Sequence, residues 1–124
     1  MPSREKVQEF IKVVESGDHV GAIEQFYTED ASMQENGAPP RVGLQTLVEH
    51  ERTALARMKR IDTHKVETFL VDGDFVAINW VFEVTDAAGT TRKLDEVALQ
   101  QWRGDKIFRE RFYYDPAQMR PSGA

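Results

Sequence analysis

Residues 75–103 read FVAINWVFEVTDAAGTTRKLDEVALQQWR, and this stretch decides which fold the chain can adopt. Apolar and polar side chains alternate along 75–86 and again along 91–103, which is the two-residue period of a β-strand. The residues between these runs, AAGT at 87–90, are typical of a tight turn. We therefore predict an antiparallel hairpin. We place Trp80 opposite Ala98, because that register joins the aromatic faces of the two strands.

The alternation continues on both sides of this hairpin. It predicts further strands over 62–72 and 106–114, connected to the hairpin by the turns DGD at 72–74 and GD at 104–105. A shorter pattern over 31–35 indicates one more strand.

Helical patterns occupy the first half of the chain. Apolar residues recur at spacings of three and four over 7–14, 20–27 and 44–60. Ser3 is placed to cap the first helix, and Gly17 is placed to end it. Helices followed by an antiparallel meander predict an α+β fold, with the helices on one face of a mostly antiparallel sheet.

Two glutamates fall on the aromatic face of the predicted sheet. Glu96 points to the same side as Trp102. Glu110 shares its face with three aromatic residues: Phe108, Phe112 and Tyr114. A buried, ionised carboxylate costs several kcal/mol unless it is paired or solvated. Two of them on one inner face therefore predict a cavity that holds water or a ligand, rather than a sealed core.

The composition excludes several classes of protein. A length of 124 residues suits a single domain over 1–124, in which we expect 117–124 to be a loose tail. The excess of 21 Asp and Glu over 16 Lys and Arg argues against a nucleic-acid partner. The chain has no cysteine, which excludes a disulfide scaffold, a zinc ribbon and a thiol nucleophile.

The sequence also lacks the patterns of membrane segments and common cofactor sites. No apolar run approaches the ~18 residues of a membrane span, and the charged start MPSREKVQEF is unlike a signal peptide, so we expect a cytoplasmic protein. Phosphate loops, nucleophile elbows and metal-ligand spacings are missing, and we expect no cofactor and no metal. We expect His19, His50 and His64 to lie on the surface.

Several stretches together carry a family resemblance: SGD at 16–18, FYTEDASM at 26–33, PRVG at 40–43, WRGDKI at 102–107 and ERFYYDP at 110–116. In their order and spacing the chain resembles the nuclear transport factor 2-like superfamily, in its SnoaL-like and ketosteroid isomerase-like branch, from residue 3 to about 118. The resemblance implies a cone, in which a curved sheet wraps around three helices (a cystatin-like α+β barrel) with a pocket at the open end. It also implies a homodimer through the outer sheet face, which here carries Val81, Val97 and Leu99.

The resemblance implies a site only in part. It places Glu35 where isomerases of this family carry the carboxylate that moves a proton next to a carbonyl. The family's two hydrogen-bond donors align with Phe10 and Ala98, which cannot donate. Glu96 lies two residues from Ala98, and Glu110 lies two residues from the position of the cyclases' acid, so both become candidates.

We therefore expect Glu35, Glu96 and Glu110 to be the catalytic residues. The expected lining of the ligand pocket comprises Tyr27, Met33, Trp80, Trp102, Phe112 and Tyr114. Each residue also has a structural interpretation. Glu35 could be a solvated acid at a loop, Glu96 could be paired with Arg41 or Arg57 in a buried salt bridge, and the aromatic residues could be ordinary core.

Two functions fit these residues. The first is a cofactor-free isomerase, cyclase or hydrolase that acts on a small apolar carbonyl compound or a polycyclic ligand. In it Glu35 is the base, Glu96 or Glu110 is the acid, and Tyr27 or Tyr114 donates a hydrogen bond. The second is a module of the same fold that binds a small ligand or dimerises without catalysis, which the missing donors at Phe10 and Ala98 favour.

Overall fold

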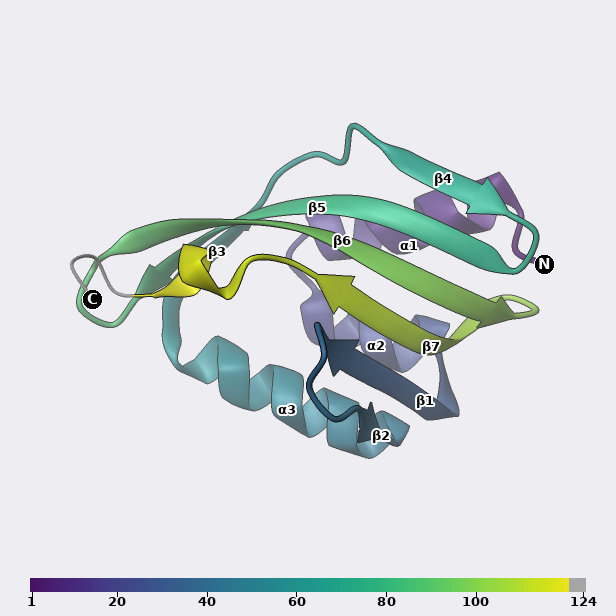
Figure 1. Ribbon diagram of the computed structural model, residues 1–124, viewed down its shortest axis with the longest axis horizontal. Helices are drawn as coiled ribbons and strands as arrows, with labels where there is room; N and C mark the ends of the chain where they lie inside the picture. Colours follow the sequence, from purple (N-terminus) through teal and green to yellow (C-terminus); the bar gives the residue numbers. More distant parts are fainter. Residues whose placement is uncertain (121–124) are drawn as a thin grey trace.

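The computed structural model describes residues 1–120, which form three α-helices and one curled sheet (Figure 1). The helices are α1 (Arg4–Glu15), α2 (His19–Phe26) and α3 (Leu44–Ala56). The strands are β1 (Tyr27–Glu35), β2 (Arg41–Val42), β3 (Met58–Thr63), β4 (Phe69–Asp72), β5 (Phe75–Asp86), β6 (Thr91–Arg103) and β7 (Lys106–Tyr113). No helix within this part of the chain is long and apolar enough to cross a membrane.

The sheet is mixed and mostly antiparallel. Its strand order is β2-β1-β7-β6-β5-β3, and β4 also pairs with β5. Only the central pair β1 and β7 is parallel among the pairings of residues 1–120. The sheet curls around the helices, so that its concave face and the helices enclose the core (Figure 1). The predicted α+β fold is confirmed.

The helix boundaries follow the predicted local signals. The Ser3 hydroxyl accepts a hydrogen bond from the Lys6 N–H at 3.0 Å and so caps α1. Gly17 has a φ of +94°, the left-handed conformation that ends a helix at low cost in a glycine. Asp18 then caps α2 by accepting from the Gly21 N–H at 2.9 Å. The short link between the two helices therefore reverses the chain and packs both on the sheet.

The predicted register of the β5–β6 hairpin is wrong by two residues. Trp80 stands opposite Glu96, and Ile78 stands opposite Ala98. The cause is the turn, in which the Asp86 N–H donates to the Thr90 carbonyl at 2.9 Å and Gly89 adopts a φ of +88°. A shift of two residues keeps every side chain on its predicted face, so Glu96 still points inward.

Two predicted element boundaries are also wrong. The helix expected over 44–60 ends at Ala56, and its last residues belong to β3. The strand expected over 62–72 is interrupted, because β3 ends at Thr63 and β4 begins at Phe69. In the gap, the Val66 N–H donates to the Glu15 carboxylate of α1 at 2.7 Å, which ties the middle of this segment to the helix, while the backbone of His64 and Thr68 still bonds to β5.

The start of β7 differs from the predicted alternation as well. Trp102 pairs with Ile107, whereas Gln101 pairs with Arg109, so one extra residue is inserted in β7. Ile107 therefore takes the inner position, and Phe108 leaves the inner face to lie under the Arg103 guanidinium at 4.5 Å. The alternation resumes beyond this bulge, which leaves Glu110 pointing inward.

The first residues of the tail expected over 117–124 belong to a regular element. Pro116–Met119 forms a short 3-10 helix, η1, that packs against β6. The Gln118 amide accepts from the Asp95 N–H at 2.7 Å and donates to the Asp95 carbonyl at 3.1 Å. Residues 121–124 of the expected tail lie outside the described residues.

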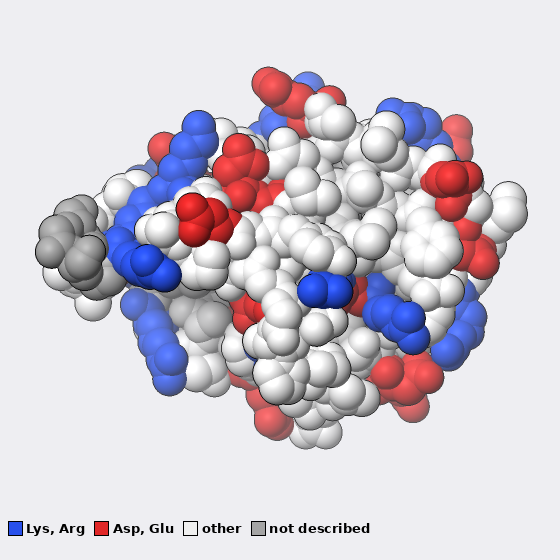
Figure 2. All heavy atoms as spheres, in the orientation of Figure 1, with Lys and Arg blue, Asp and Glu red and all other residues white. Residues whose placement is uncertain are grey.

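Uncharged side chains cover much of the outer face of the sheet (Figure 2). Val97 and Leu99 on β6 are 42% and 41% exposed there, and the half-buried Val81 on β5 points to the same side. Charged side chains lie mainly around the margin of this face (Figure 2). The three apolar residues named by the family resemblance thus share one solvent-facing surface.

Candidate active site

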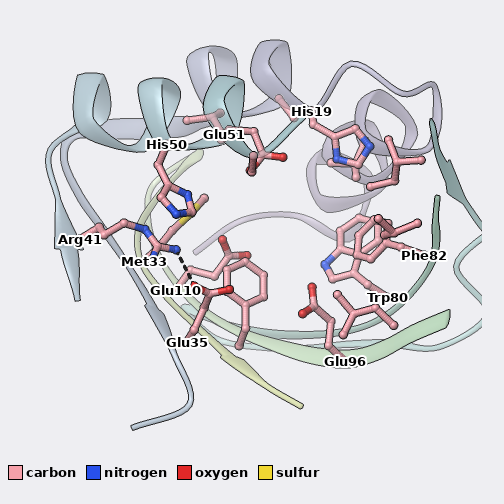
Figure 3. Close-up of a pocket in the computed structure, with 18 of the residues that line it drawn as sticks. His19, Met33, Glu35, Arg41, His50, Glu51, Trp80, Phe82, Glu96 and Glu110 are labelled. Carbon is pink, nitrogen blue, oxygen red and sulfur yellow. Dashed lines mark ion pairs between the residues drawn. The ribbon is translucent and has the colours of Figure 1, made fainter. Parts of the chain in front are cut away.

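A cavity of about 200 Å³ lies between the concave face of the sheet and the helices (Figure 3). The three predicted carboxyl groups, Glu35, Glu96 and Glu110, all line it. Four of the six residues expected to bind a ligand also line it: Tyr27, Met33, Trp80 and Phe112. The other two do not. Trp102 is buried behind the cavity wall, and Tyr114 contacts Glu35 from outside.

The sheet register explains why the carboxyl groups converge. Glu110 on β7 stands opposite Met33 on β1. Glu35, two residues beyond Met33, stands opposite Phe112 of β7, which in turn stands opposite Ala98 of β6, so the three form one row across the sheet. Glu96, two residues before Ala98 on β6, lies in the next row. Each row is about 6.6 Å from the next along the strands. Three inward-facing carboxyl groups on neighbouring strands are therefore spread along one cavity wall.

Glu110 is the deepest carboxyl group and belongs to a buried hydrogen-bonded chain. The Trp102 indole N–H donates to Gln100 Oε1 at 2.9 Å, and Gln100 Nε2 donates to Glu110 Oε2 at 2.6 Å. The Tyr27 hydroxyl is hydrogen-bonded to the other oxygen, Glu110 Oε1. Burial raises the pKa of Glu110 to about 7, although both donors favour its ionised form. All four side chains are at most 3% exposed.

Glu96 has a different environment. Its carboxyl group has no hydrogen bond or ion pair with any residue in 1–120, so the predicted pairing with Arg41 or Arg57 does not occur. Burial, followed by the nearby carboxylates Glu110 and Glu35, raises the pKa of Glu96 to about 8. Glu96 is therefore mostly protonated at neutral pH and presents an unused O–H to the cavity.

Glu35 lies at the cavity rim and has two partners. Its Oε2 pairs with Arg41 Nη2 at 3.0 Å, and its Oε1 accepts from the Tyr114 hydroxyl at 3.1 Å. Figure 3 shows the ion pair on the wall opposite α3. Burial and the adjacent Glu35 charge raise the pKa of Tyr114 to about 12, which keeps this hydroxyl a donor. The site thus contains one carboxyl group that is paired with a cation and one, Glu96, that has no partner among residues 1–120.

The lining also includes four further ionisable residues: His19, Arg41, His50 and Glu51. The surface position expected for His19 is wrong, since it is 9% exposed and its Nε2 lies 3.2 Å from the Thr63 hydroxyl. His50 is exposed yet borders the cavity, and His64 lies on the surface beside Glu83 at 3.2 Å. Burial lowers the pKa of both His19 and His50, so both favour the neutral form.

For two of these residues, His19 and Glu51, the helical spacing from buried apolar residues predicts a side chain that points inward. His19 precedes the buried Ala22 and Ile23 by three and four residues, and Glu51 follows the buried Leu47 by four. Burial raises the pKa of Glu51, as expected for a carboxyl group on the inner side of α3. Arg41 offers no such signal, because β2 is only two residues long.

The described residues include no group of three His, Asp or Glu side chains that could hold a metal ion. The polar groups of the cavity can instead move protons and donate hydrogen bonds. These groups are Glu35, Glu96 and the hydrogen-bonded Tyr27–Glu110 pair. The surrounding wall is apolar and aromatic, which strengthens electrostatic interactions within it.

The buried chain behind Glu110 makes a testable contribution to stability. We expect Gln100→Leu to lower the free energy of unfolding by about 2–4 kcal/mol, because it leaves the Trp102 N–H and Glu110 Oε2 without partners. The loss should grow from pH 5 to pH 8, since the ionised form of Glu110 depends on the Gln100 donor. Urea denaturation at both pH values measures the effect. Gln101→Leu, on the outer side of the same strand, is the control, and an equal cost for both variants would contradict the proposed role of the chain.

Solved structures share this architecture. A candidate SnoaL-like polyketide cyclase from Mesorhizobium loti is 29% identical, with a TM-score of 0.73 over 92% of this chain and 100% of that chain. TerC, co-crystallised with polyporic acid, is 19% identical with a TM-score of 0.78, over 93% of this chain and 92% of its own. A protein of unknown function with a cystatin-like fold from Xanthomonas campestris is 19% identical with a TM-score of 0.81, over 96% and 95%. The last two similarities concern the fold alone.

A comparison of sequences supports the same relationship. No curated protein matches the chain at a significant level. The model of the SnoaL-like domain family, however, matches residues 7–110, which include α2, α3, most of α1 and the cavity carboxyl groups. Together with the NTF2-like, ketosteroid isomerase-like fold, this match shows that the chain belongs to the SnoaL-like domain family.

Proposed function

We propose that the cavity carries out cofactor-free acid/base chemistry on a small apolar compound that contains a carbonyl group. The supporting observation is that two carboxyl groups with different partners face one apolar cavity: Glu35 is paired with Arg41, whereas burial raises the pKa of Glu96 to about 8 and Glu96 has no partner among residues 1–120. Two carboxyl groups in contrasting environments are the usual pattern of an acid and a base in one site.

The contacts suggest a role for each group. Glu35 is the base, because each of its oxygens retains a free lone pair beside the cavity and can accept a proton from the carbon next to the carbonyl. Glu96 is the acid, because its proton has no acceptor among residues 1–120 and is free to be donated to the carbonyl oxygen. Glu110 is less suited to direct transfer, since both of its oxygens are bonded to protein groups.

The size of the cavity favours a small ligand. A volume of about 200 Å³ is close to the ~150 Å³ of an apolar cavity known to hold benzene. A single ring with substituents therefore fits better than a polycyclic compound. TerC, whose fold is similar, was co-crystallised with an organic acid, polyporic acid. This neighbour supports a small organic ligand.

Exchange of hydrogen for deuterium tests the proposal without knowledge of the natural substrate. The protein is incubated in D₂O with single-ring ketones, cyclohexanone and acetophenone, and loss of the α-proton signal is followed by NMR. The proposal predicts exchange faster than in buffer alone. Exchange at the buffer rate for these ketones, in a protein that binds them, would instead indicate a binding module.

The alternative of a binding module without catalysis is supported by the contacts of Glu35. Glu35 already has a counter-ion, because Arg41 Nη2 lies 3.0 Å from its Oε2. A small-ligand-binding protein of the same fold needs the cavity and its hydrogen-bond donors but no proton transfer.

We also propose that two chains associate through the outer sheet face. The exposed Val97 and Leu99 share this face with the exposed Tyr113, which stands opposite Val97. We expect light scattering to give the mass of two chains, and Leu99→Glu to give the mass of one, because a charge at this position would be desolvated in the interface. Thr53→Glu, on the exposed side of α3, is the control and should remain dimeric. A wild-type protein with the mass of one chain would contradict the proposal.

A further inference from the structure

The hydrogen bonds that link Trp102, Gln100 and Glu110 can run in one direction only, from donor to acceptor. An indole N–H can only donate a hydrogen bond, so the atom of Gln100 that faces Trp102 must be the amide oxygen. The amide NH₂ of Gln100 must then face Glu110 and donate to Oε2. Glu110 Oε2 is thereby an acceptor, which leaves Oε1 as the oxygen that carries the proton of Glu110.

Oε1 is the oxygen bonded to Tyr27. A hydroxyl has one proton, so the Tyr27–Glu110 pair can adopt only two arrangements. When Glu110 is ionised, the Tyr27 proton is donated to Oε1. When Glu110 is protonated, Oε1 donates to the Tyr27 oxygen, and the Tyr27 proton has to turn elsewhere. Tyr27 lines the cavity, and its ring packs against Phe10 with centroids 6.1 Å apart, so the proton turns toward the cavity.

We propose that Tyr27 is the group that donates a hydrogen bond to a carbonyl oxygen of the ligand, and that it does so only while Glu110 carries a proton. Gln100 and Trp102 are positioning residues, because they fix which oxygen of Glu110 is protonated. The inference rests on the cavity of the proposed function but not on turnover. A carbonyl oxygen has two lone pairs, so Tyr27 can bind it together with Glu96.

The ionisable groups around Tyr27 and Glu110 set the pH at which Glu110 gains or loses its proton. Burial is the main cause that raises the pKa of Glu110 to about 7, and Glu51 of α3 raises it further. Glu96 of β6 lies on the same wall, followed by Glu35 of β1 with its partner Arg41. The neutral forms of His19 and His50 face the cavity from α2 and α3. Because most neighbouring groups are acids, the switch is expected near neutral pH.

The stretching frequency of a bound carbonyl tests this inference. Benzaldehyde is a suitable probe, because it is a single ring with a carbonyl and has no α-proton that Glu35 could remove. We expect its C=O band to be lowered in the wild-type protein at pH 5.5 and to return toward the unbonded value at pH 9. A band that is not lowered at pH 5.5 with benzaldehyde in large excess overturns the inference, whatever the result of the exchange experiment with ketones.

Variants separate the individual steps and are compared in a Glu96→Gln background, because Glu96 itself loses its proton near pH 8 whereas an amide at this position does not titrate. In this background Tyr27→Phe should abolish the pH-dependent part of the shift, whereas Tyr113→Phe, on the exposed face of β7, should leave it unchanged. In Glu110→Gln the new amide can donate to the Tyr27 oxygen at every pH, so the lowered band should no longer depend on pH. Gln100→Leu should move the midpoint to higher pH, because Glu110 loses a donor that favours its ionised form. An unchanged pH profile in Tyr27→Phe or in Glu110→Gln would overturn the inference.

Discussion

Replacing Glu35 by Gln is expected to slow α-proton exchange of a bound ketone by about 10²–10⁴-fold, the usual contribution of a general base. An amide cannot accept the proton, although it keeps the shape of the carboxylate and its hydrogen bond from Tyr114. The ion pair with Arg41 is partly exposed, with 26% and 38% of the two side chains accessible, so its loss should change stability by at most about 1 kcal/mol. A slower reaction would therefore reflect chemistry rather than folding.

The exchange rate of Glu35→Gln is measured by NMR beside its ligand affinity, obtained from the rise in melting temperature with acetophenone. Glu29→Gln is the matched control, because Glu29 is an exposed glutamate on the same strand. We expect unchanged affinity in both variants and slow exchange only in Glu35→Gln. An exchange rate within threefold of the wild type would mean that another group is the base.

The sequence was sufficient to predict the fold class because its strongest patterns are local. The alternation over 75–103 required a hairpin, and the signals at Ser3 and Gly17 located the ends of α1. The register was wrong by two residues, because it depends on the φ of a single turn residue, Gly89. Such an error preserves the face of each side chain, which is why Glu96 was correctly expected to point inward.

Interruptions of the pattern were harder to foresee. The bulge that turns Phe108 outward depends on how β7 meets the end of β6, and the gap between β3 and β4 depends on a hydrogen bond from Val66 to Glu15. These contacts join residues far apart in the chain. Periodicity within one segment contains no information about them, so the predicted strands were too regular.

The candidate site was predictable where it lies on long elements. Glu35, Glu96 and Glu110 were identified from strand alternation and from the family resemblance, and the structure brings them to one cavity. The hydrogen-bond partners were not predictable. Tyr27 and Gln100 meet Glu110 only after the parallel β1–β7 pair and the β6–β7 hairpin have formed. The role proposed for Glu110 depends on those partners rather than on residue type.

Replacing Glu96 by Gln is expected to stabilise the protein at alkaline pH. The carboxyl group of Glu96 has an ordinary pKa of 4.5, and burial raises it to about 8 in the folded chain. Between these values the folded state holds a proton that the unfolded chain has lost, so stability is highest below pH 4.5 and falls as the pH rises to about 8. The full shift corresponds to a loss on the order of 4 kcal/mol between pH 5 and pH 9. Glutamine has no charge to bury and avoids this part of the loss.

We therefore expect Glu96→Gln and the wild type to unfold at similar temperatures at pH 5. At pH 9 the variant should unfold more than about 10 °C higher, since 1 kcal/mol shifts the melting temperature of a domain of this size by roughly 3–6 °C. Glu67→Gln, at an exposed position between β3 and β4, is the control and should follow the wild type at both pH values. A difference of equal size at pH 5 and pH 9 would mean that packing, not the charge of Glu96, is responsible. Glu96 would then have to be ionised without penalty, and it could not serve as the protonated acid of the cavity.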